Sequence, residues 1–126
     1  MKILDTNIIL RYLLRDNIEQ ANVAKEAIES GATTLSEVIM EVIYVLHKHY
    51  MVPKTEICKS LLALSKGVHV AEQEVILYAL KVFESHNLDY VDCLLVAKAV
   101  LRGEDIITFD KKIKKTIAIL KSQKAN

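Results

Sequence analysis

The chain has 126 residues, of which 52% are hydrophobic, and a formal net charge of +1. This length and composition predict one globular domain over residues 1–126 and exclude a disordered chain. Charged residues interrupt the apolar stretches, so we expect neither a membrane span nor a signal peptide, and a cytoplasmic location. The two cysteines, Cys58 and Cys93, are expected to be buried reduced thiols.

Charge is unevenly distributed along the chain. Residues 98–126 hold eight Lys or Arg against three Asp or Glu, whereas residues 1–97 hold nine against thirteen. A basic C-terminal segment can bind an anionic polymer, but solvated surface lysines produce the same pattern. The charge pattern by itself therefore leaves nucleic-acid binding open.

The predicted elements alternate between short strands and helices. Strands are expected at residues 2–4, 32–35, 68–71 and 105–108, with a fifth candidate at 116–120. Helices are expected at residues 7–14, 19–30, 35–50, 54–65, 72–85 and 89–103. This alternation predicts an α/β fold of three layers, with a four- or five-stranded parallel sheet covered by helices on both faces.

The helix expected at residues 35–50 has two distinctive features. Thr34 and Glu37 have the spacing of a capping box, so the helix should begin near Leu35 or Ser36. Its side chains are apolar on nearly every face, which predicts burial or a subunit contact. The second possibility is the reason for expecting a homodimer.

Four acids lie in or directly beside apolar stretches: Asp5 in KILDTNII, Glu41 in VIMEVIYVL, Asp92 in LDYVDCLLVA and Asp110 in DIITFDKK. An unpaired carboxylate is costly to bury, so each needs a partner. Each also has a local alternative, because Asp5, Asp92 and Asp110 could serve helix N-termini. Glu41 lies more than one turn inside its helix, where the dipole offers little, and is the hardest to explain structurally.

The four acids follow strand ends or begin helices, so all can face the end of the sheet where ligands bind in open parallel folds. Two carboxylates about 4 Å apart repel by about 4 kcal/mol at an effective dielectric of 20. That is a large fraction of the roughly 5–15 kcal/mol by which a domain is stable. A bound cation would offset the repulsion, and all-oxygen ligation favours Mg²⁺ or Mn²⁺ over zinc.

The segments MKILDTNIILRYLL, SEVIMEVIYVL, LDYVDCLLVAKA and DIITFDKK, in this order over almost the whole length, resemble the PIN-domain ribonucleases. The chain's size resembles the toxin half of VapBC-type toxin–antitoxin pairs. The resemblance implies a PIN-like fold and an acidic, metal-binding active site of Asp5, Glu41, Asp92 and Asp110.

The resemblance implies further roles for individual residues. Asn7 and Thr108 would support the site through hydrogen bonds, and Asp89 would cap a helix. Asp5 is the usual assignment for the acid that accepts a proton from water, although the residues alone leave this open. The substrate would be RNA, and a cognate antitoxin would present an Arg or Lys to the carboxylates. Growth inhibition and RNA maturation both remain open as the biological role.

Basic residues near the acids are candidates for contacts with RNA phosphates. Arg11, Lys111 and Lys112 are close to the acids in sequence and could offset backbone charge. Aromatic residues make up only 6% of the chain, so base stacking is expected to contribute little. The four histidines occupy unrelated places and are not expected to be catalytic.

Other functional classes fit the sequence less well. A phosphoacceptor receiver domain also places acids at strand ends, but it has no need for Glu41 and would require a differently placed lysine. A phosphotransferase of the haloacid-dehalogenase type would require an Asp where Asn7 stands. A non-catalytic RNA- or protein-binding module stays open, and it would tolerate neutralisation of the acids.

Overall fold

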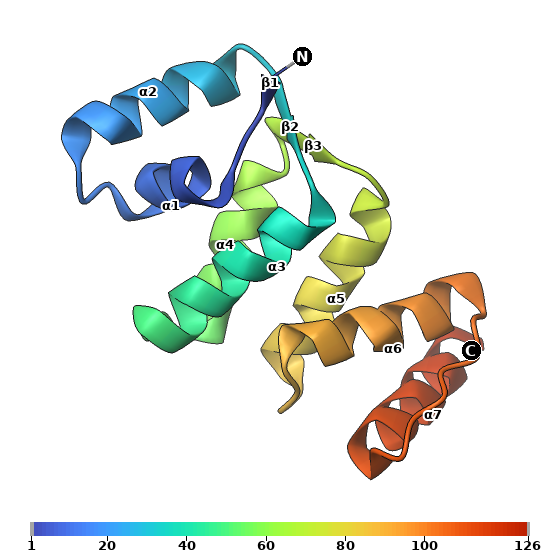
Figure 1. The fold of residues 1–126 in the computed structure, drawn as a ribbon. Helices are drawn as coiled ribbons and strands as arrows, with labels where there is room; N and C mark the ends of the chain where they lie inside the picture. The colour runs from blue at the N-terminus through green and yellow to red at the C-terminus, as the bar shows by residue number, and fades with distance from the viewer. Residues whose placement is uncertain (1, 126) are drawn as a thin grey trace. The chain divides into compact units, whose positions relative to one another are not determined.

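The computed structural model describes residues 2–125. The elements in chain order are β1, α1, α2, β2, α3, η1, α4, β3, α5, α6 and α7, and Figure 1 labels all of them except η1. The chain divides into two compact units, one up to Gln73 and one from Glu74 onwards, and each is described by itself below. A single domain over residues 1–126 therefore stays a prediction. Within the described part of the chain, no helix is both long and apolar enough to cross a membrane.

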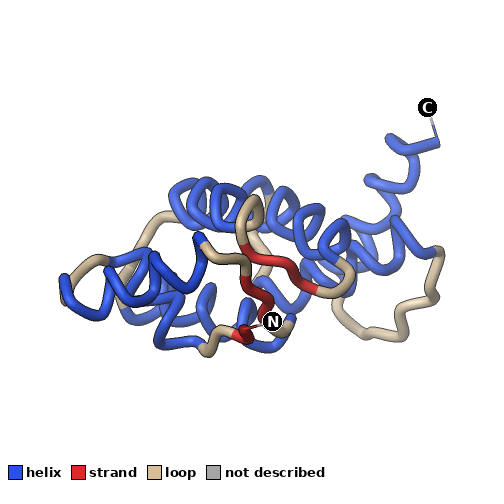
Figure 2. Tube along the Cα trace, turned by 90° about the horizontal axis from the view of Figure 1, so that it is seen from above, coloured by secondary structure: helices blue, strands red, loops and turns tan. Residues whose placement is uncertain are grey.

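A parallel sheet forms the centre of the N-terminal unit. Its three strands are β1 (Lys2–Ile3), β2 (Ala32–Thr34) and β3 (Val68–Val70), drawn as short red segments in Figure 2. β2 is the middle strand, and it pairs with β1 on one side and β3 on the other. Side chains alternate along a strand. Val68 and Val70 are accordingly buried, whereas His69 between them is exposed.

Helices connect the strands of this unit, as parallel pairing requires. They are α1 (Thr6–Leu14), α2 (Ile18–Glu29), α3 (Ser36–Tyr44), the π-helical turn η1 (Val45–His49) and α4 (Lys54–Leu64). α1 packs against both α2 and α3, and α2 also contacts β2. The core of the unit includes the fully buried side chains of Ile9, Val42, Ile43, Ile57 and Val68.

Helices and irregular connections make up the described part of the C-terminal unit. It contains α5 (Gln73–Ser85, of which all but the first residue belongs here), α6 (Tyr90–Arg102) and α7 (Lys111–Ala125). The rings of Phe83 and Tyr90 meet edge to face, with centroids 5.8 Å apart. The Tyr90 hydroxyl donates to the carbonyl of Ile76 at 3.1 Å, which joins the start of α6 to α5. α6 in turn packs on α7.

The α/β class and the parallel sheet are confirmed, but two predicted strands are wrong. Residues 105–108 form an irregular connection before α7, seen as the long tan segment in Figure 2. A strand exists only when another backbone completes its hydrogen bonds, and sequence pattern cannot supply that partner. Residues 116–120 lie inside α7, where Ile113 and Thr116 are buried one helical turn apart. Within residues 2–125 the sheet therefore has three strands rather than four or five.

The start of α3 at Ser36 agrees with prediction, but the expected capping box does not form. The Thr34 hydroxyl instead donates to the carbonyl of Leu4 at 2.7 Å, linking β2 to the end of β1. Glu37 accepts a hydrogen bond from the hydroxyl of Ser36 at 2.8 Å, which holds the pKa of Glu37 below its ordinary value. The helix predicted to reach Tyr50 does so through the wider π turn, because the Tyr50 N–H bonds to Val45 five residues earlier.

Candidate active site

Asp5 lies where the chain leaves the sheet and enters α1. Leu4 is held against β2 by a hydrogen bond from its N–H to the Thr33 carbonyl at 2.8 Å. Asp5 then adopts an extended backbone as the N-cap of α1, and its carboxylate accepts the Ile8 N–H at 2.9 Å. This bond satisfies one of the free N–H groups at the helix start. The side chain is still exposed, so its second oxygen is open to a ligand.

Asn7 and Arg11 lie one turn apart on α1 and line a shallow pocket beside α2. The Arg11 guanidinium forms an ion pair with Asp16 at 2.7 Å and a hydrogen bond with Tyr50, which together raise its pKa. Its Nε atom is buried without a hydrogen-bond partner. Arg11 is therefore engaged in structure, and the expectation that it binds a substrate phosphate finds no support in these contacts.

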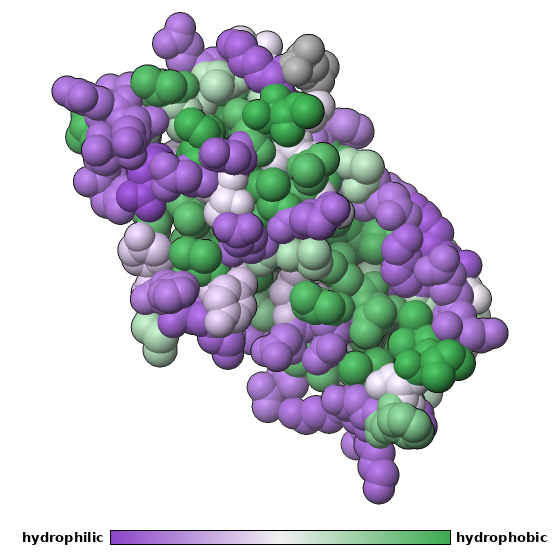
Figure 3. Space-filling view, in the orientation of Figure 1, coloured by the Kyte–Doolittle hydropathy of each residue, from purple (hydrophilic) through white to green (hydrophobic). Residues whose placement is uncertain are grey.

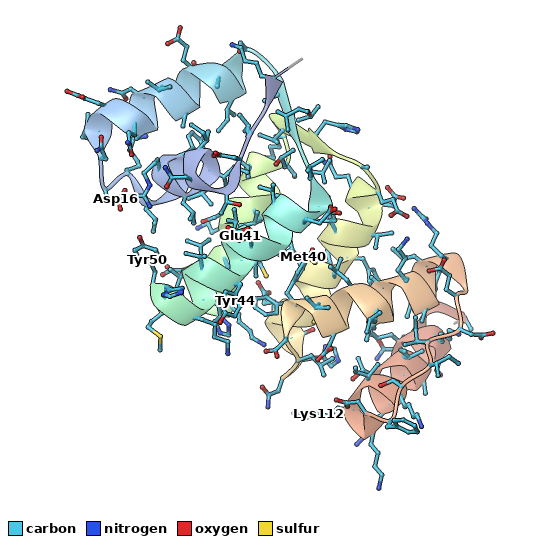
Figure 4. The ribbon with its side chains drawn as sticks, in the orientation of Figure 1. Asp16, Met40, Glu41, Tyr44, Tyr50 and Lys112 are labelled. Atoms are coloured by element: carbon cyan, nitrogen blue, oxygen red, sulfur yellow. The ribbon has the colours of Figure 1, made fainter. Side chains whose placement is uncertain are left out.

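Glu41 occupies the exposed side of α3, although its sequence neighbours are apolar. The helix turns Val42 and Ile43 into the core and leaves the Glu41 carboxylate outside, as labelled in Figure 4. No capping or ion-pair contact at this position accounts for the charge within the described residues. Glu41 is therefore solvated, and the sequence-based argument that a carboxylate near the core needs a buried partner does not apply to it.

Asp92 lies in the first turn of α6 and is partly buried. Burial raises its pKa, and the charges of Asp89 and Asp110 raise it further. The charges of Asp89 and Asp110 therefore act on Asp92 within the C-terminal unit. Asp89 is the N-cap residue by position, as predicted, but its side chain makes no capping hydrogen bond. A cation near Asp92 would offset this negative charge.

Asp110 begins α7 as Asp5 begins α1. Its carboxylate accepts the Ile113 N–H at 3.1 Å, and the Asp110 N–H donates to the Thr108 hydroxyl at 3.0 Å. Thr108 thus shapes the turn that presents Asp110, in line with the supporting role that the resemblance implies. Of the nearby cations, Lys111 is exposed, and Lys112 donates to the Asn87 carbonyl at 3.0 Å while its side chain stays at the surface.

The four acids are divided between the units, with Asp5 and Glu41 in the first and Asp92 and Asp110 in the second. Among residues 2–125, no group of three or more His, Cys, Asp or Glu side chains is arranged to hold a metal ion. The donor chemistry nevertheless fits a hard divalent cation, because every candidate ligand is a carboxylate oxygen. The assignment of all four acids to one site stays a prediction.

Sequence reasoning missed the contacts of Arg11. The bond to Tyr50 joins α1 to the residue that follows η1, far away in the sequence. The pairing with Asp16 could have been suspected from proximity, but no sequence signal indicates the Tyr50 partner. Tyr50 was also overlooked because its hydroxyl and ring have no motif around them.

The candidate site residues all lie within a match to one protein family. The family model described as PIN domain matches residues 2–118, a range that contains all four acids and both supporting residues. Neither the curated proteins nor the solved structures include a significant match. The family is one of nucleases that generally use divalent metals. Because the match covers most of the chain, the chain belongs to the PIN domain family.

Proposed function

We propose that this protein is an endoribonuclease that hydrolyses RNA phosphodiester bonds with Mg²⁺ or Mn²⁺. The observation that carries the proposal is the PIN match over residues 2–118. It is supported by the positions of Asp5 and Asp110, each held at a helix start with its carboxylate exposed. The exposed charge of Glu41 and the raised pKa of Asp92 are further support.

In this proposal Asp5, Glu41, Asp92 and Asp110 share one active site and hold the metal. A bound divalent cation would lower the pKa of water and offset charge on the phosphate. The helix starts at Asp5 and Asp110 orient the two carboxylates, because one oxygen of each is fixed by a backbone N–H. Asp5 accepts the proton of the attacking water. Exposed Lys111 offsets the charge of a neighbouring RNA phosphate.

The biological role that we propose is the toxin of a toxin–antitoxin pair, with RNA processing as the alternative. The motive is the order of the four acidic segments along a short chain. Its antitoxin would place an Arg or Lys among the carboxylates. Growth arrest on expression of the chain, relieved by the protein of the neighbouring gene, would support this role. Harmless expression with nothing co-purifying would contradict it.

A homodimer is part of the same proposal, although the structure changes its basis. Sequence pattern suggested a helix with apolar residues on nearly all sides. The structure buries Ile39, Val42, Ile43 and Leu46 within the chain, so these residues are not free to form a subunit contact. Sedimentation velocity at micromolar concentration decides the point, since a monomer there would contradict the dimer.

The central test substitutes one acid of α3 and the acid that caps α1, with a second acid of α3 as the control. Glu41→Gln and Asp5→Asn should each abolish metal-dependent cleavage of a labelled RNA, because a ligand charge is lost. Glu37→Gln is the matched control, since Glu37 is exposed on α3 and its carboxylate accepts a hydrogen bond from Ser36. It should cleave like the unmodified protein.

Metal dependence is measured in the same assay with Mg²⁺, with Mn²⁺ and with EDTA. Cleavage that persists in EDTA would refute the proposed chemistry. RNA binding that survives all the substitutions, with no metal-dependent product from the unmodified protein, would instead identify a non-catalytic binding module.

A further inference from the structure

Polar contacts join α1 and α3 at both of their ends. At the sheet, the Thr34 hydroxyl donates to the Leu4 carbonyl, so the entry to α1 is tied to the strand that leads into α3. In the middle the two helices pack on each other, and Ile9 of α1 and Val42 of α3 are completely buried. At the far end, the Arg11 side chain reaches from α1 to residues outside that helix.

Arg11 lies in the last turn of α1 and has two partners. Its guanidinium forms an ion pair with Asp16 at 2.7 Å and a hydrogen bond with Tyr50, and its side chain is only 16% exposed. The Arg11 Nε atom is buried without a hydrogen-bond partner among the described residues. A buried donor that has lost water and gained no acceptor destabilises the folded state. Packing alone therefore does not explain an arginine at this position.

The π-helical turn η1 determines where Tyr50 lies. The Tyr50 N–H donates to the Val45 carbonyl at 3.2 Å, five residues earlier. Such a turn holds one more residue than an α-helical turn. Because each residue of an α-helix advances by about 100°, Tyr50 points roughly 100° away from the direction that a regular α-helix would give it. π-helical turns are frequent at functional sites, which directs attention to what Tyr50 contacts.

The bridge from Arg11 lies at the end of α1 opposite to Asp5. Asp5 precedes Arg11 by six residues, which is roughly 9 Å along the helix axis at about 1.5 Å per residue. Figure 4 shows Asp16 and Tyr50 on one side of the N-terminal unit and Glu41 further along α3. A change in the direction of α1 about its packed middle would move its two ends in opposite senses. The contacts at one end therefore control the position of the carboxylate at the other.

We propose that Arg11 is a positioning residue, whose bridge to Tyr50 and Asp16 fixes the direction of α1 relative to α3 and thereby the separation of the Asp5 and Glu41 carboxylates. Two carboxylates share a divalent cation only if their oxygens lie at the distances that the ion requires. Mg²⁺ demands near-octahedral geometry at about 2.0–2.1 Å, so it tolerates little error in that separation. In this role Arg11 touches neither metal nor RNA. The inference rests on the proposed nuclease function and adds a residue to it.

Two other roles for Arg11 are less well supported. Direct binding of an RNA phosphate would need an available positive charge, whereas Asp16 already offsets the charge of the guanidinium. A partner chain that covered this region would favour an apolar surface, but in Figure 3 the surface over α1 and α2 is mostly hydrophilic. The contacts of Arg11 therefore favour a role within the chain.

The first test removes the Tyr50 hydroxyl and keeps its ring. Tyr50→Phe in the full chain should raise the Kd for Mn²⁺ by about 10-fold, the lower range for residues that orient metal ligands. Electron paramagnetic resonance of the free ion, without RNA, measures this Kd. The same variant should lower kcat for RNA cleavage by a similar factor and leave KM unchanged. Tyr44→Phe is the matched control, because Tyr44 is an exposed tyrosine of α3, and it should equal the parent protein.

A conservative substitution and its combination with Tyr50→Phe test the arginine. Arg11→Lys keeps a positive charge beside Asp16 but lacks the planar guanidinium that donates to two partners. It should weaken Mn²⁺ binding as much as Tyr50→Phe does. The double variant should bind no more weakly than either single variant, because both substitutions remove the same bond. Losses that multiply in the double variant would contradict the bridge.

The direction of α1 is measured without any metal. Residual dipolar couplings of the backbone amides in α1 and α3 report the angle between the two helices in solution. In the parent protein and in Tyr44→Phe, the couplings of both helices should fit the angle of the structure. In Tyr50→Phe the couplings of α1 should depart from that fit, whereas those of α3 should be unchanged.

The outcomes separate positioning from the other roles of Arg11. If Tyr50→Phe leaves the couplings or the Mn²⁺ Kd unchanged, Arg11 does not set the separation of the carboxylates and the proposal is wrong. If only Tm falls, Arg11 serves stability alone. If KM rises while the Mn²⁺ Kd is unchanged, the arginine contacts RNA instead.

Failure of the nuclease proposal has a different signature. A parent protein that neither binds Mn²⁺ nor cleaves RNA would refute the proposed function. Couplings of α1 that still shift in Tyr50→Phe would then leave the Arg11 bridge standing as the contact that directs α1. Couplings that do not shift would refute both.

Discussion

The two units of the chain present their acids in different electrostatic surroundings. In the N-terminal unit, Asp5 and Glu41 are exposed, and Asp5 follows a paired strand. In the C-terminal unit, Asp92 is partly buried, and the charges of Asp89 and Asp110 act on it. The carboxylates are therefore solvated in the N-terminal unit, whereas Asp92 in the C-terminal unit is partly desolvated. The negative charge of Asp92 is therefore less favourable than that of an exposed carboxylate, and a nearby cation would stabilise it.

Each unit also contains one acid that caps a helix, Asp5 in the first and Asp110 in the second. Asp5 and Asp110 form the same local hydrogen bond, from the N–H three residues onward. Asp5 is anchored by the sheet behind it, through Leu4 and Thr33, whereas Asp110 follows an irregular segment whose Phe109 is 99% exposed. The cap is thus formed by local sequence in both cases, but only Asp5 follows a residue that is hydrogen-bonded to the sheet.

The largest expected effect is on cleavage by the C-terminal acids. Asp92→Asn should lower the rate constant by at least about 100-fold, the lower range for a positioned catalytic group. Asp110→Asn should lower it less, because Asp110 follows the irregular residues 103–110, whereas Asp92 lies inside α6. Single-turnover cleavage of a labelled RNA by both variants measures the difference. An equal loss in both would show that the irregular segment before Asp110 does not reduce its contribution.

An intermediate effect concerns stability at the two helix starts. Asp5→Ala and Asp110→Ala should each lower the free energy of unfolding by about 1 kcal/mol, because the caps to Ile8 and Ile113 are lost. Asp5→Asn and Asp110→Asn keep a capping oxygen and should lose only a few tenths, while still impairing cleavage. Urea denaturation tests both pairs. If Asn destabilises as much as Ala, the carboxylates do not stabilise by capping.

The smallest expected effect is a pH dependence of the metal-free protein. The pKa of Asp92 is raised in the folded state, so folding favours its protonated form. Its contribution to stability is present below the ordinary carboxyl pKa and is lost as pH rises through the raised folded value. Asp92→Asn should therefore raise Tm slightly at pH 7, and the gain should shrink towards pH 4.

Thermal melts in EDTA, with Asp105→Asn as an exposed control, measure this difference. A gain for Asp92→Asn that is independent of pH would contradict the electrostatic explanation. A gain of equal size in Asp105→Asn would show that only total negative charge matters.

Most helices could be predicted from the sequence, because their signals are local. Gly31 and Gly103 have positive φ angles of 88° and 67° at the ends of α2 and α6, where sequence placed helix stops. The four acids could also be selected from sequence, since each interrupts an apolar stretch. Their convergence on one site could not be predicted in this way, because it depends on residues far apart along the chain.

The sequence by itself determined the helical periodicity, the α/β class and the identity of the unusual acids, since these follow from residue type and short spacing. Tertiary structure alone decided the rest. In the folded chain the Thr34 hydroxyl donates to the Leu4 carbonyl and does not cap a helix. Residues 105–108 have no strand partner, and Arg11 is hydrogen-bonded to Tyr50. Strand pairing, burial and hydrogen bonds between distant segments of the chain all require a second segment at the right distance. No local sequence pattern encodes that distance.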